Sequence, residues 1–257
     1  MEQDAAPGSL LRFAGTGTAF HHDGRGSQSL LVEPRSGSPF IVDVGPTAVC
    51  SMERFEWSLS RLGALFLTHL HGDHTAGWPF LLLNLDKQHR RREPLDLFGP
   101  VGMRRQLEGL VELCYGDLLS ASLLGFEVRY HELEVAAARQ LAAGDLLFDV
   151  VPLEHHPTSI GYRFHLEDGR VAVTGDTRWC PALEELAQES DLVVLECTSI
   201  EPTDQAHLSL VEIREKVKRL GRGRLILIHL TDAVASALAA DPLAGVVASH
   251  DGMVFPV

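Results

Sequence analysis

The first forty-four residues of the chain alternate short apolar runs with turn-forming residues, a pattern that predicts β-strands. The apolar runs, each bounded by Gly, Pro or Ser, are residues 10–13, 29–32 and 40–44. Apolar side chains then recur with the spacing of an amphipathic helix over residues 47–62. A buried strand over residues 64–67 follows, and it leads directly into a polar segment.

Strands and helices alternate through the rest of the chain. Further strands are expected at residues 95–98, 126–130, 146–151, 161–165, 171–174, 192–196, 224–228 and 253–255. Helices are expected at residues 78–85 and 102–119, from Pro181 onward, and from a capping box at Ser209 to about Leu220. This order predicts an α/β fold of two stacked sheets with helices outside, in one domain over residues 1–257.

The composition is that of an ordinary globular protein, with 45% apolar and 22% charged residues. Lys and Arg number 22 and Asp and Glu number 35, so the net charge is −13. A field of this sign repels a polyanion, and an extended nucleic-acid partner is therefore disfavoured. None of the four cysteines forms a C-x-x-C pair, which argues against a thiolate zinc site.

No apolar run approaches the ~18 residues that a membrane-spanning helix needs. The acidic residues at the start of the chain lead into no apolar segment typical of a signal peptide. We therefore expect a soluble cytoplasmic protein without a membrane partner.

A dense cluster of metal-ligand side chains follows the strand at residues 64–67. His69, His71, Asp73 and His74 fall within six residues, and imidazole and carboxylate suit zinc and related divalent ions. A spacing of two residues puts His69 and His71 on one side of an extended segment, and a glycine then lets the backbone turn back. Two adjacent pairs of ligands can thus face two metal ions.

Further ligands are needed, and three candidates also lie at predicted strand ends: His155, Asp176 and His229. With its H-x-H-x-D-H segment the chain resembles the metallo-β-lactamase superfamily, and within it the ribonuclease Z-like phosphodiesterase branch. The stretches that carry the second resemblance are residues 15–19, 155 with 161–163, 175–178, and 196 with 206–209 and 228–231. The likeness spans residues 11–256.

The resemblance implies the metallo-β-lactamase fold, an αββα sandwich of two stacked mixed β-sheets flanked by helices. It also implies two divalent ions, zinc first, with manganese or iron as alternatives. The expected ligands are His69, His71 and His155 for one ion, Asp73, His74 and His229 for the other, and Asp176 bridging both. His156, next to His155, is a rival ligand.

Such a site hydrolyses its substrate with a hydroxide that bridges the two ions. A leaving alkoxide also needs a proton, and the resemblance places His207 at the active site as the general acid. Glu196, at the end of its strand, would orient and charge that imidazole. The expected catalytic residues are therefore Asp73, His207 and Glu196. On an early loop, His21 and His22 either line the pocket or lie on the surface.

The expected activity is a phosphodiesterase that acts on a small, anionic nucleotide or cyclic-nucleotide diester. Ribonuclease Z-type cleavage of tRNA 3′ ends is an alternative, but residues 162–175 hold no insertion like the basic arm with which that family grips tRNA. A lactonase, thioesterase or β-lactam-type acyl hydrolase is a second alternative, and a catalytically silent binding protein is a third. Members of the family are often dimers, so a homodimer is compatible with the resemblance.

Overall fold

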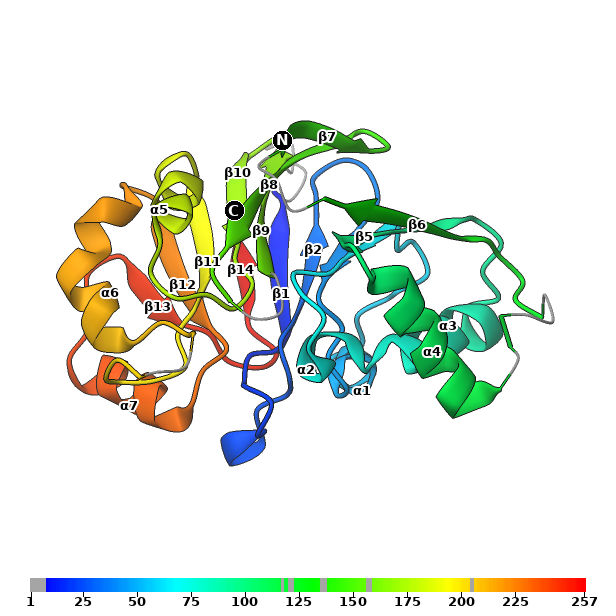
Figure 1. Ribbon diagram of the computed structural model, residues 1–257, viewed down its shortest axis with the longest axis horizontal. Coiled ribbons are helices and arrows are strands. Elements are labelled where there is room, and N and C mark those ends of the chain that lie inside the picture. The colour runs from blue at the N-terminus through cyan, green and yellow to red at the C-terminus, as the bar shows by residue number, and fades with distance from the viewer. Residues whose placement is uncertain (1–7, 117, 120–122, 135–137, 156–158, 204–205) are drawn as a thin grey trace, which may run out of the picture.

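The computed structural model describes residues 8–116, 118–119, 123–134, 138–155, 159–203 and 206–257. In this part of the chain two mixed β-sheets stack face to face, and helices cover the outer face of each (Figure 1). The expected αββα sandwich is therefore confirmed. None of the helices within the described ranges is long and apolar enough to cross a membrane.

The strands of the first sheet are β1 (Leu10–Gly15), β2 (Ser29–Glu33), β3 (Phe40–Val42), β4 (Ala64–Phe66), β5 (Leu95–Pro100), β6 (Val128–Leu133) and β14 (Val254–Pro256). They lie in the order β14-β1-β2-β3-β4-β5-β6. Pairs from β14 to β3 are antiparallel, and pairs from β3 to β6 are parallel. The first and the last strand of the described chain are thus neighbours.

The strands of the second sheet are β7 (Ala138–Ala143), β8 (Leu146–Leu153), β9 (Ser159–Leu166), β10 (Gly169–Val173), β11 (Leu192–Glu196), β12 (Arg224–Ile228) and β13 (Val246–Ala248). They lie in the order β13-β12-β11-β10-β9-β8-β7. Pairs from β7 to β10 are antiparallel, and pairs from β10 to β13 are parallel. Both sheets therefore join an antiparallel half to a parallel half.

Helices flank both sheets. Beside the first sheet lie α1 (Ala48–Arg54), α2 (Gly72–Thr75), α3 (Trp78–Leu83) and α4 (Met103–Tyr115), with the π-helical turn η2 (Asn84–Gln88) after α3. Beside the second lie α5 (Pro181–Gln188), α6 (Leu210–Lys216) and α7 (Asp232–Ala240), with the 3₁₀ turn η3 (Val217–Leu220) after α6. Another 3₁₀ turn, η1 (His22–Gly24), lies between β1 and β2. Each helical layer packs apolar side chains against its sheet, such as Trp78 on one side and Ile213 on the other.

Aromatic side chains fill the space between the sheets. Phe66 on β4 is fully buried, and five rings surround it at centroid distances of 5.3, 4.9, 5.1, 5.3 and 4.9 Å: Phe40, Phe98, Phe148, Tyr162 and Phe164. Aromatic pairs at such distances contribute about 0.5–1.5 kcal/mol beyond the burial of their area. The Tyr162 hydroxyl also donates to the backbone carbonyl of Leu67 at 2.8 Å. The core therefore fixes the point at which the chain leaves β4.

Two helices end earlier than the sequence pattern predicts. The helix expected over residues 47–62 stops at Arg54, because Glu56 has a φ of 56°, which a right-handed helix does not allow. The helix expected over residues 102–119 stops at Tyr115, since Gly116 has a φ of 62° and a ψ of −130°. In both places a single backbone conformation ends an apolar pattern that continues beyond it.

The capping box at Ser209 is confirmed, because its hydroxyl accepts from the backbone N–H of Glu212 while the Glu212 carboxylate accepts from the backbone N–H of Ser209. Four other elements, α2, β7, α7 and β13, were not expected. Three of them are short or lie at the edge of a sheet, where the apolar pattern is weak. α7 had a detectable start signal, since Thr231 caps its first turn by accepting from the backbone N–H of Val234.

Candidate metal centre

Parallel strands carry the predicted ligands to one edge of the sandwich. β4 ends three residues before His69, and β10 ends three residues before Asp176. β12 ends immediately before His229, and β11 ends at Glu196. Because parallel strands in one sheet end at the same edge, these side chains meet although they lie far apart in the sequence.

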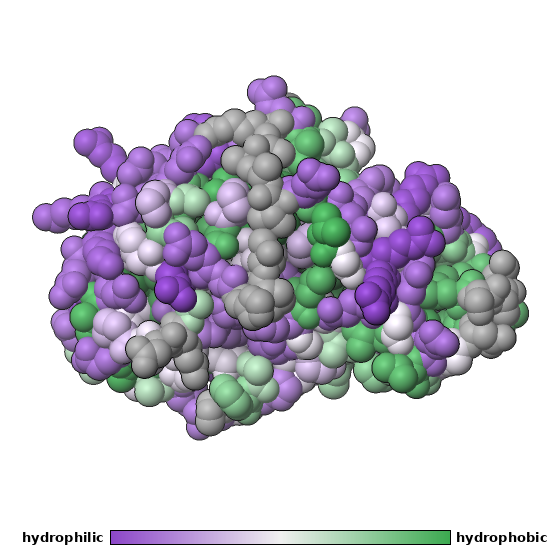
Figure 2. Space-filling view, in the orientation of Figure 1, coloured by the Kyte–Doolittle hydropathy of each residue, from purple (hydrophilic) through white to green (hydrophobic). Residues whose placement is uncertain are grey.

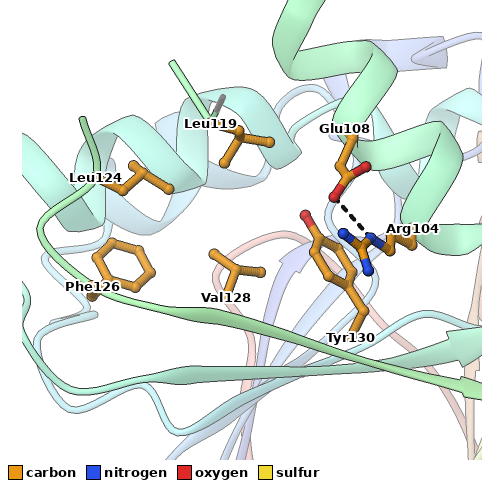
Figure 3. Close-up of a pocket in the computed structure, with 7 residues that line it drawn as sticks. All are labelled: Arg104, Glu108, Leu119, Leu124, Phe126, Val128 and Tyr130. Carbon is orange, nitrogen blue, oxygen red and sulfur yellow. Dashed lines mark hydrogen bonds and ion pairs between the residues drawn. The ribbon is translucent and has the colours of Figure 1, made fainter. Parts of the chain in front are cut away.

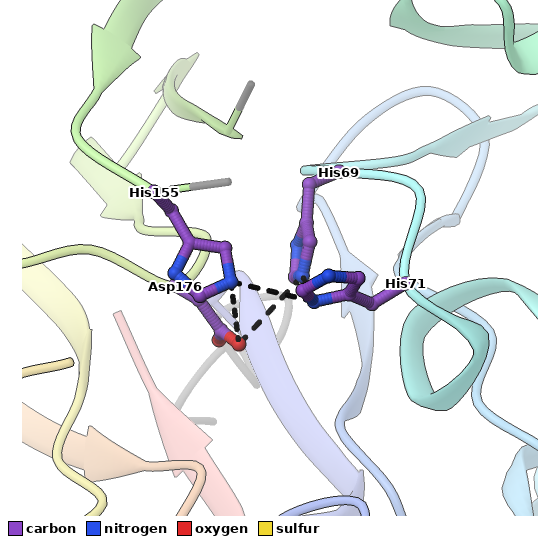
Figure 4. Close-up of side chains that lie close together, drawn as sticks. All are labelled: His69, His71, His155 and Asp176. Atoms are coloured by element: carbon purple, nitrogen blue, oxygen red, sulfur yellow. Dashed lines mark hydrogen bonds and ion pairs between the residues drawn. The ribbon is translucent and has the colours of Figure 1, made fainter. Parts of the chain in front are cut away.

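His69, His71, His155 and Asp176 form the first group of converging side chains (Figure 4). One ligand atom of each lies within 4.8 Å of the others. Nδ1 of His71 lies 3.1 Å from Nε2 of His69 and 3.3 Å from Nε2 of His155. Oδ2 of Asp176 lies 3.6 Å from Nε2 of His69 and 3.9 Å from Nε2 of His155. Three imidazoles and one carboxylate thus converge.

Asp73, His74 and His229 form the second group. Oδ2 of Asp73 lies 3.3 Å from Nε2 of His229 and 3.5 Å from Nε2 of His74. Asp176 reaches this group as well, with Oδ1 at 3.6 Å from Nε2 of His74 and Oδ2 at 3.7 Å from Nε2 of His229. The structure therefore brings all seven predicted ligand side chains together and places Asp176 in contact with both groups.

The ring nitrogens that face away from the two groups are held by hydrogen bonds. Nδ1 of His155 donates to the backbone carbonyl of Ala206 at 2.9 Å. Nδ1 of His229 lies 2.9 Å from the Thr198 hydroxyl. Outer contacts of this kind fix the tautomer and orientation of a ligating histidine. Nε2 of each ring is thereby left to face a metal ion.

Asp43 is a site residue that the sequence reasoning missed. Its fully buried carboxylate lies 2.8 Å from Nδ1 of His74 and accepts from the backbone N–H and the hydroxyl of Thr68, both at 2.8 Å. It also accepts from Nε2 of Gln28 at 3.0 Å. Asp43 thus orients one imidazole and fixes the start of the ligand loop. A signal was present, because Asp43 is an acidic residue within the apolar run at residues 40–44, and the strand of the structure ends just before it.

Two buried polar atoms of the cluster are left without a partner by the side chains of the described residues. Nε2 of His74 and Oδ1 of Asp176 are buried and have no hydrogen-bond partner among the described residues. Unsatisfied buried polar atoms are rare in native proteins, and a divalent ion bound by both would satisfy them. Imidazoles with carboxylates are a donor set that zinc, manganese and iron accept. The residues present therefore fit a dinuclear metal site.

The pKa shifts of three ligands suit metal binding, whereas at His74 the charges of Asp176 and Asp43 outweigh burial and raise the pKa of the ring. Burial would raise the pKa of Asp73, but the hydrogen bond from His229 and the charges of His229 and His74 hold it well below its ordinary value. The charges of the same two histidines outweigh burial and lower the pKa of Asp176. Burial lowers the pKa of His69 and keeps its ring neutral. Ionised carboxylates and neutral imidazoles are the forms that bind metal ions.

His207 and Glu196 lie in contact at the side of this cluster. Nδ1 of His207 is 3.2 Å from Oε1 of Glu196 and 3.8 Å from Oδ2 of Asp176. Oε1 of the fully buried Glu196 also accepts from the backbone N–H groups of Thr177 and Leu208. Burial alone would lower the pKa of His207, but the hydrogen bond and charge of Glu196 outweigh it and raise that pKa. The predicted contact is present, and the catalytic role of the pair stays a prediction.

The other histidines near the site have different outcomes. His156, the rival ligand, lies outside the described residues, as does the side chain of His22. His21 is partly exposed, and its Nε2 lies 2.5 Å from the Ser27 hydroxyl. His21 belongs to neither of the two described groups of ligands.

A cavity of about 360 Å³ lies elsewhere, beside α4 and β6 (Figure 3). Its lining residues are Arg104, Glu108, Leu119, Leu124, Phe126, Val128 and Tyr130. The Arg104 guanidinium donates to Glu108 at 2.9 Å and lies 5.5 Å from the centroid of the Tyr130 ring. No predicted ligand lines this cavity, so it is separate from the candidate metal centre.

Comparisons with known proteins agree with this architecture. The model of the family described as Anti-Pycsar protein Apyc1 matches residues 10–252. The chain is 28% identical over 251 residues to the ribonuclease Z of Mycobacterium sp. (strain KMS), with 88% of this chain and 86% of the relative covered. Human short-form tRNase Z has a TM-score of 0.77 at 22% identity, covering 96% and 99% of the two chains. A diphosphatase from the PhnP family has a TM-score of 0.76 at 20% identity, covering 97% and 98%.

At these identities the two solved structures show the fold alone. Together with the curated relatives, they confirm the resemblance to the ribonuclease Z-like branch of the metallo-β-lactamase superfamily. The protein is a metal-dependent hydrolase of this fold. Because a single family model matches it over residues 10–252, the chain belongs to the family of the anti-Pycsar protein Apyc1.

Proposed function

We propose that the protein is a dinuclear metal-dependent phosphodiesterase that hydrolyses a small nucleotide or cyclic-nucleotide diester. The observation that carries this proposal is the position of His207, held by Glu196 and 3.8 Å from Asp176 in the cluster of seven ligand side chains. Cleavage of a sugar phosphodiester expels an alkoxide, which needs a proton, whereas a thioester expels a thiolate, which does not. An imidazole beside the cluster meets that need.

In this proposal His69, His71 and His155 hold one ion, Asp73, His74 and His229 hold the other, and Asp176 contacts both. Two divalent ions in such a site lower the pKa of water towards neutrality and stabilise negative charge on phosphoryl oxygens. The chain's own contribution is preorganisation, since Asp43, Ala206 and Thr198 already orient three of the imidazoles. We expect zinc, with manganese or iron as alternatives.

His207 acts as the general acid. Its Nδ1 is engaged by Glu196, so Nε2 is the ring nitrogen that donates to the leaving oxygen. The raised pKa favours the protonated ring at neutral pH. Glu196 touches no reacting atom and is a positioning residue that holds the ring and stabilises its charge. A general acid of this kind contributes about 10²–10⁴-fold to the rate.

The turn between β9 and β10 supports a small substrate. Only Glu167 and Asp168 separate the two strands, and residues 159–176 are all described, so this segment carries no projecting arm. In the ribonuclease Z family, which the sequence resembles, a basic arm in this interval grips tRNA. The net charge of −13 also repels a polyanion.

Ribonuclease Z-type cleavage is the second candidate, because curated relatives at 25–28% identity carry that name. The same ligands and the same general acid would serve an RNA phosphodiester. The two candidates differ only in what surrounds the scissile bond, so a direct comparison of substrates separates them.

The test compares initial rates of the purified, zinc- or manganese-loaded protein on cyclic nucleotides, bis(p-nitrophenyl) phosphate, a tRNA precursor, a lactone and a β-lactam. We expect turnover of cyclic nucleotides that a chelator abolishes and metal restores. Efficient precursor cleavage with no turnover of small diesters would support the second candidate instead. Opening of the lactone or the β-lactam without any diester cleavage would overturn both.

A further inference from the structure

Residues 17–26 form a loop that projects from the edge of the sandwich beside the candidate metal centre (Figure 1). The loop starts next to a predicted ligand, because the backbone N–H of Leu230, the residue after His229, donates to the carbonyl of Thr16 at 2.8 Å. Gly17 forms a parallel bridge with Leu230 and another with Ser27. The base of the loop is therefore built into the strand end that presents His229.

One carboxylate holds both ends of this loop. Oδ1 of Asp251 accepts from the backbone N–H of Thr16 at 2.9 Å and from its hydroxyl at 2.7 Å. Oδ2 accepts from the backbone N–H of Gly26 at 2.7 Å. Arg25 adds a second clamp, donating to the Thr16 hydroxyl and to a carboxylate oxygen of Asp232. The loop is thus held rigidly at its base.

The far part of the loop is tightly wound and is linked to the ligand segment through Ser27. His21 and Asp23 have φ values of 49° and 57°, a conformation that bulky residues adopt only where their surroundings impose it. His21 reaches back to the Ser27 hydroxyl. Gly45 fits between Ser27 and the Asp73 backbone so closely that a Cβ on it would lie 2.3 Å from the Asp73 carbonyl oxygen. Contacts therefore run from the wound part of the loop to a predicted ligand.

Phe20 lies on this rigid loop with 76% of its surface exposed. A single exposed apolar residue is common and by itself indicates nothing. Here, however, the aromatic residue directly precedes His21 and is three Cα steps, at most about 11 Å, from Gly17 beside the metal centre. Hydrophilic residues predominate on the face seen in Figure 2, with hydrophobic residues between them in its upper, central and lower parts.

We propose that Phe20 is the surface on which the nucleobase of the substrate stacks while its phosphodiester lies at the metal centre. This inference rests on the proposed function, because the substrate must carry a base. A base has a flat, apolar face that a rigid aromatic ring recognises without selecting one base over another. A ring on a clamped loop loses little freedom when the base binds.

The test measures binding as well as turnover in the metal-loaded protein. Calorimetry gives the affinities of adenosine monophosphate and of ribose phosphate, which lacks the base, for the wild type and for Phe20→Ala. We expect the substitution to weaken binding of the nucleotide about 5- to 100-fold and to lower its affinity ratio over ribose phosphate by the same factor. Phe20→Trp should restore the ratio. Phe80→Ala, which removes a half-exposed phenylalanine from α3, should match the wild type.

Three results would overturn the inference: an unchanged affinity ratio in Phe20→Ala, equal weakening of both ligands, or no binding of the nucleotide by the wild type. Equal weakening together with a change in molecular mass in solution would instead assign Phe20 to contact with a second copy. Turnover of cyclic nucleotides separates the two proposals. If the wild type cleaves no diester yet the affinity ratio depends on Phe20, the stacking surface stands and the phosphodiesterase proposal fails. If the wild type cleaves cyclic nucleotides and Phe20→Ala leaves both cleavage and the affinity ratio unchanged, the phosphodiesterase proposal is supported and the stacking proposal fails.

Discussion

Nε2 of His74 and Oδ1 of Asp176 face each other across 3.6 Å, and neither buried atom has a hydrogen-bond partner among the described residues. A direct hydrogen bond could satisfy both atoms only if they moved closer together than 3.6 Å. A shared cation resolves it without moving either side chain. This pair is therefore the part of the cluster that depends most on a metal ion.

Asp176→Asn should remove bound metal and activity together. The substitution keeps the shape of the side chain but removes the charge that both groups of ligands share, so both ions lose a partner. Metal content measured by elemental analysis after gel filtration, alongside diester hydrolysis, checks this. Asp145→Asn, in the exposed turn between β7 and β8, is the matched control. Full metal content in Asp176→Asn would contradict the assignment of this residue.

Asp43→Asn should weaken metal binding about 10- to 100-fold without unfolding the protein. The amide cannot hold Nδ1 of His74 and Thr68 as the carboxylate does, so the imidazole loses its fixed orientation. Competition with a metallochromic chelator gives the affinity. Gln28→Ala removes a different contact to the same carboxylate and should have a smaller effect. Equal effects of the two substitutions would mean that Asp43 acts through general packing.

His207→Ala should retain its metal but lower kcat about 10²–10⁴-fold on a cyclic nucleotide, whose leaving group is an alkoxide. The loss should be much smaller on bis(p-nitrophenyl) phosphate, because nitrophenolate leaves without a proton. His131→Ala, on β6 and paired with Asp96, should behave like the wild type on both substrates. The same loss on both substrates would rule out the general-acid role of His207.

Asp149→Asn should destabilise the fold in a pH-dependent way. The buried carboxylate accepts from the backbone N–H of Gln140 and from Arg163, both at 2.9 Å, and these contacts outweigh burial and lower its pKa. A lowered folded-state pKa gives stability that is present above the unfolded pKa of about 4 and is lost as the pH falls through the folded value. The free energy of unfolding of the variant should therefore be about 3 kcal/mol lower than that of the wild type at pH ~7.

Urea denaturation at neutral pH and below pH ~4 checks this prediction, with Asp145→Asn as the exposed control. The difference between Asp149→Asn and the wild type should shrink at the acidic pH, because the unfolded wild-type carboxylate is protonated first and the folded one follows at its lower pKa. A difference that is the same at both pH values would show that the charge of Asp149 contributes nothing.

The convergence of the ligands could be predicted from the sequence because each of them follows an apolar strand. Asp43 satisfied the same rule but carried no motif around it, so only the hydrogen bonds to His74 and Thr68 reveal its role. The contact between His207 and Glu196 was expected from the resemblance. The hydrogen bonds that Glu196 accepts from two backbone N–H groups depend on how loops pack, which no local pattern encodes.

The fold was predictable where apolar runs were strong, as in β11 and β12, whose observed bounds match the expected ones. Prediction failed where one backbone conformation interrupts a continuing pattern, as at Glu56 after α1. Residues 87–92 are rich in basic side chains, and such a run is usually solvated, but Arg91 is an exception. In the structure this side chain is only 6% exposed and donates to the carbonyls of Leu62, Glu93 and Pro94.

The contacts of Asp251 with Thr16 and Gly26 affect the order in which parts of the fold form during synthesis. The loop that carries Phe20 is synthesised early, yet it is fixed by the carboxylate of Asp251, 225 residues after Gly26. β1 likewise has β14 as a neighbour in its sheet. Neither contact can form before residues 251–256 have been synthesised, so this edge of the sandwich matures well after the ligand loop at His69 has emerged.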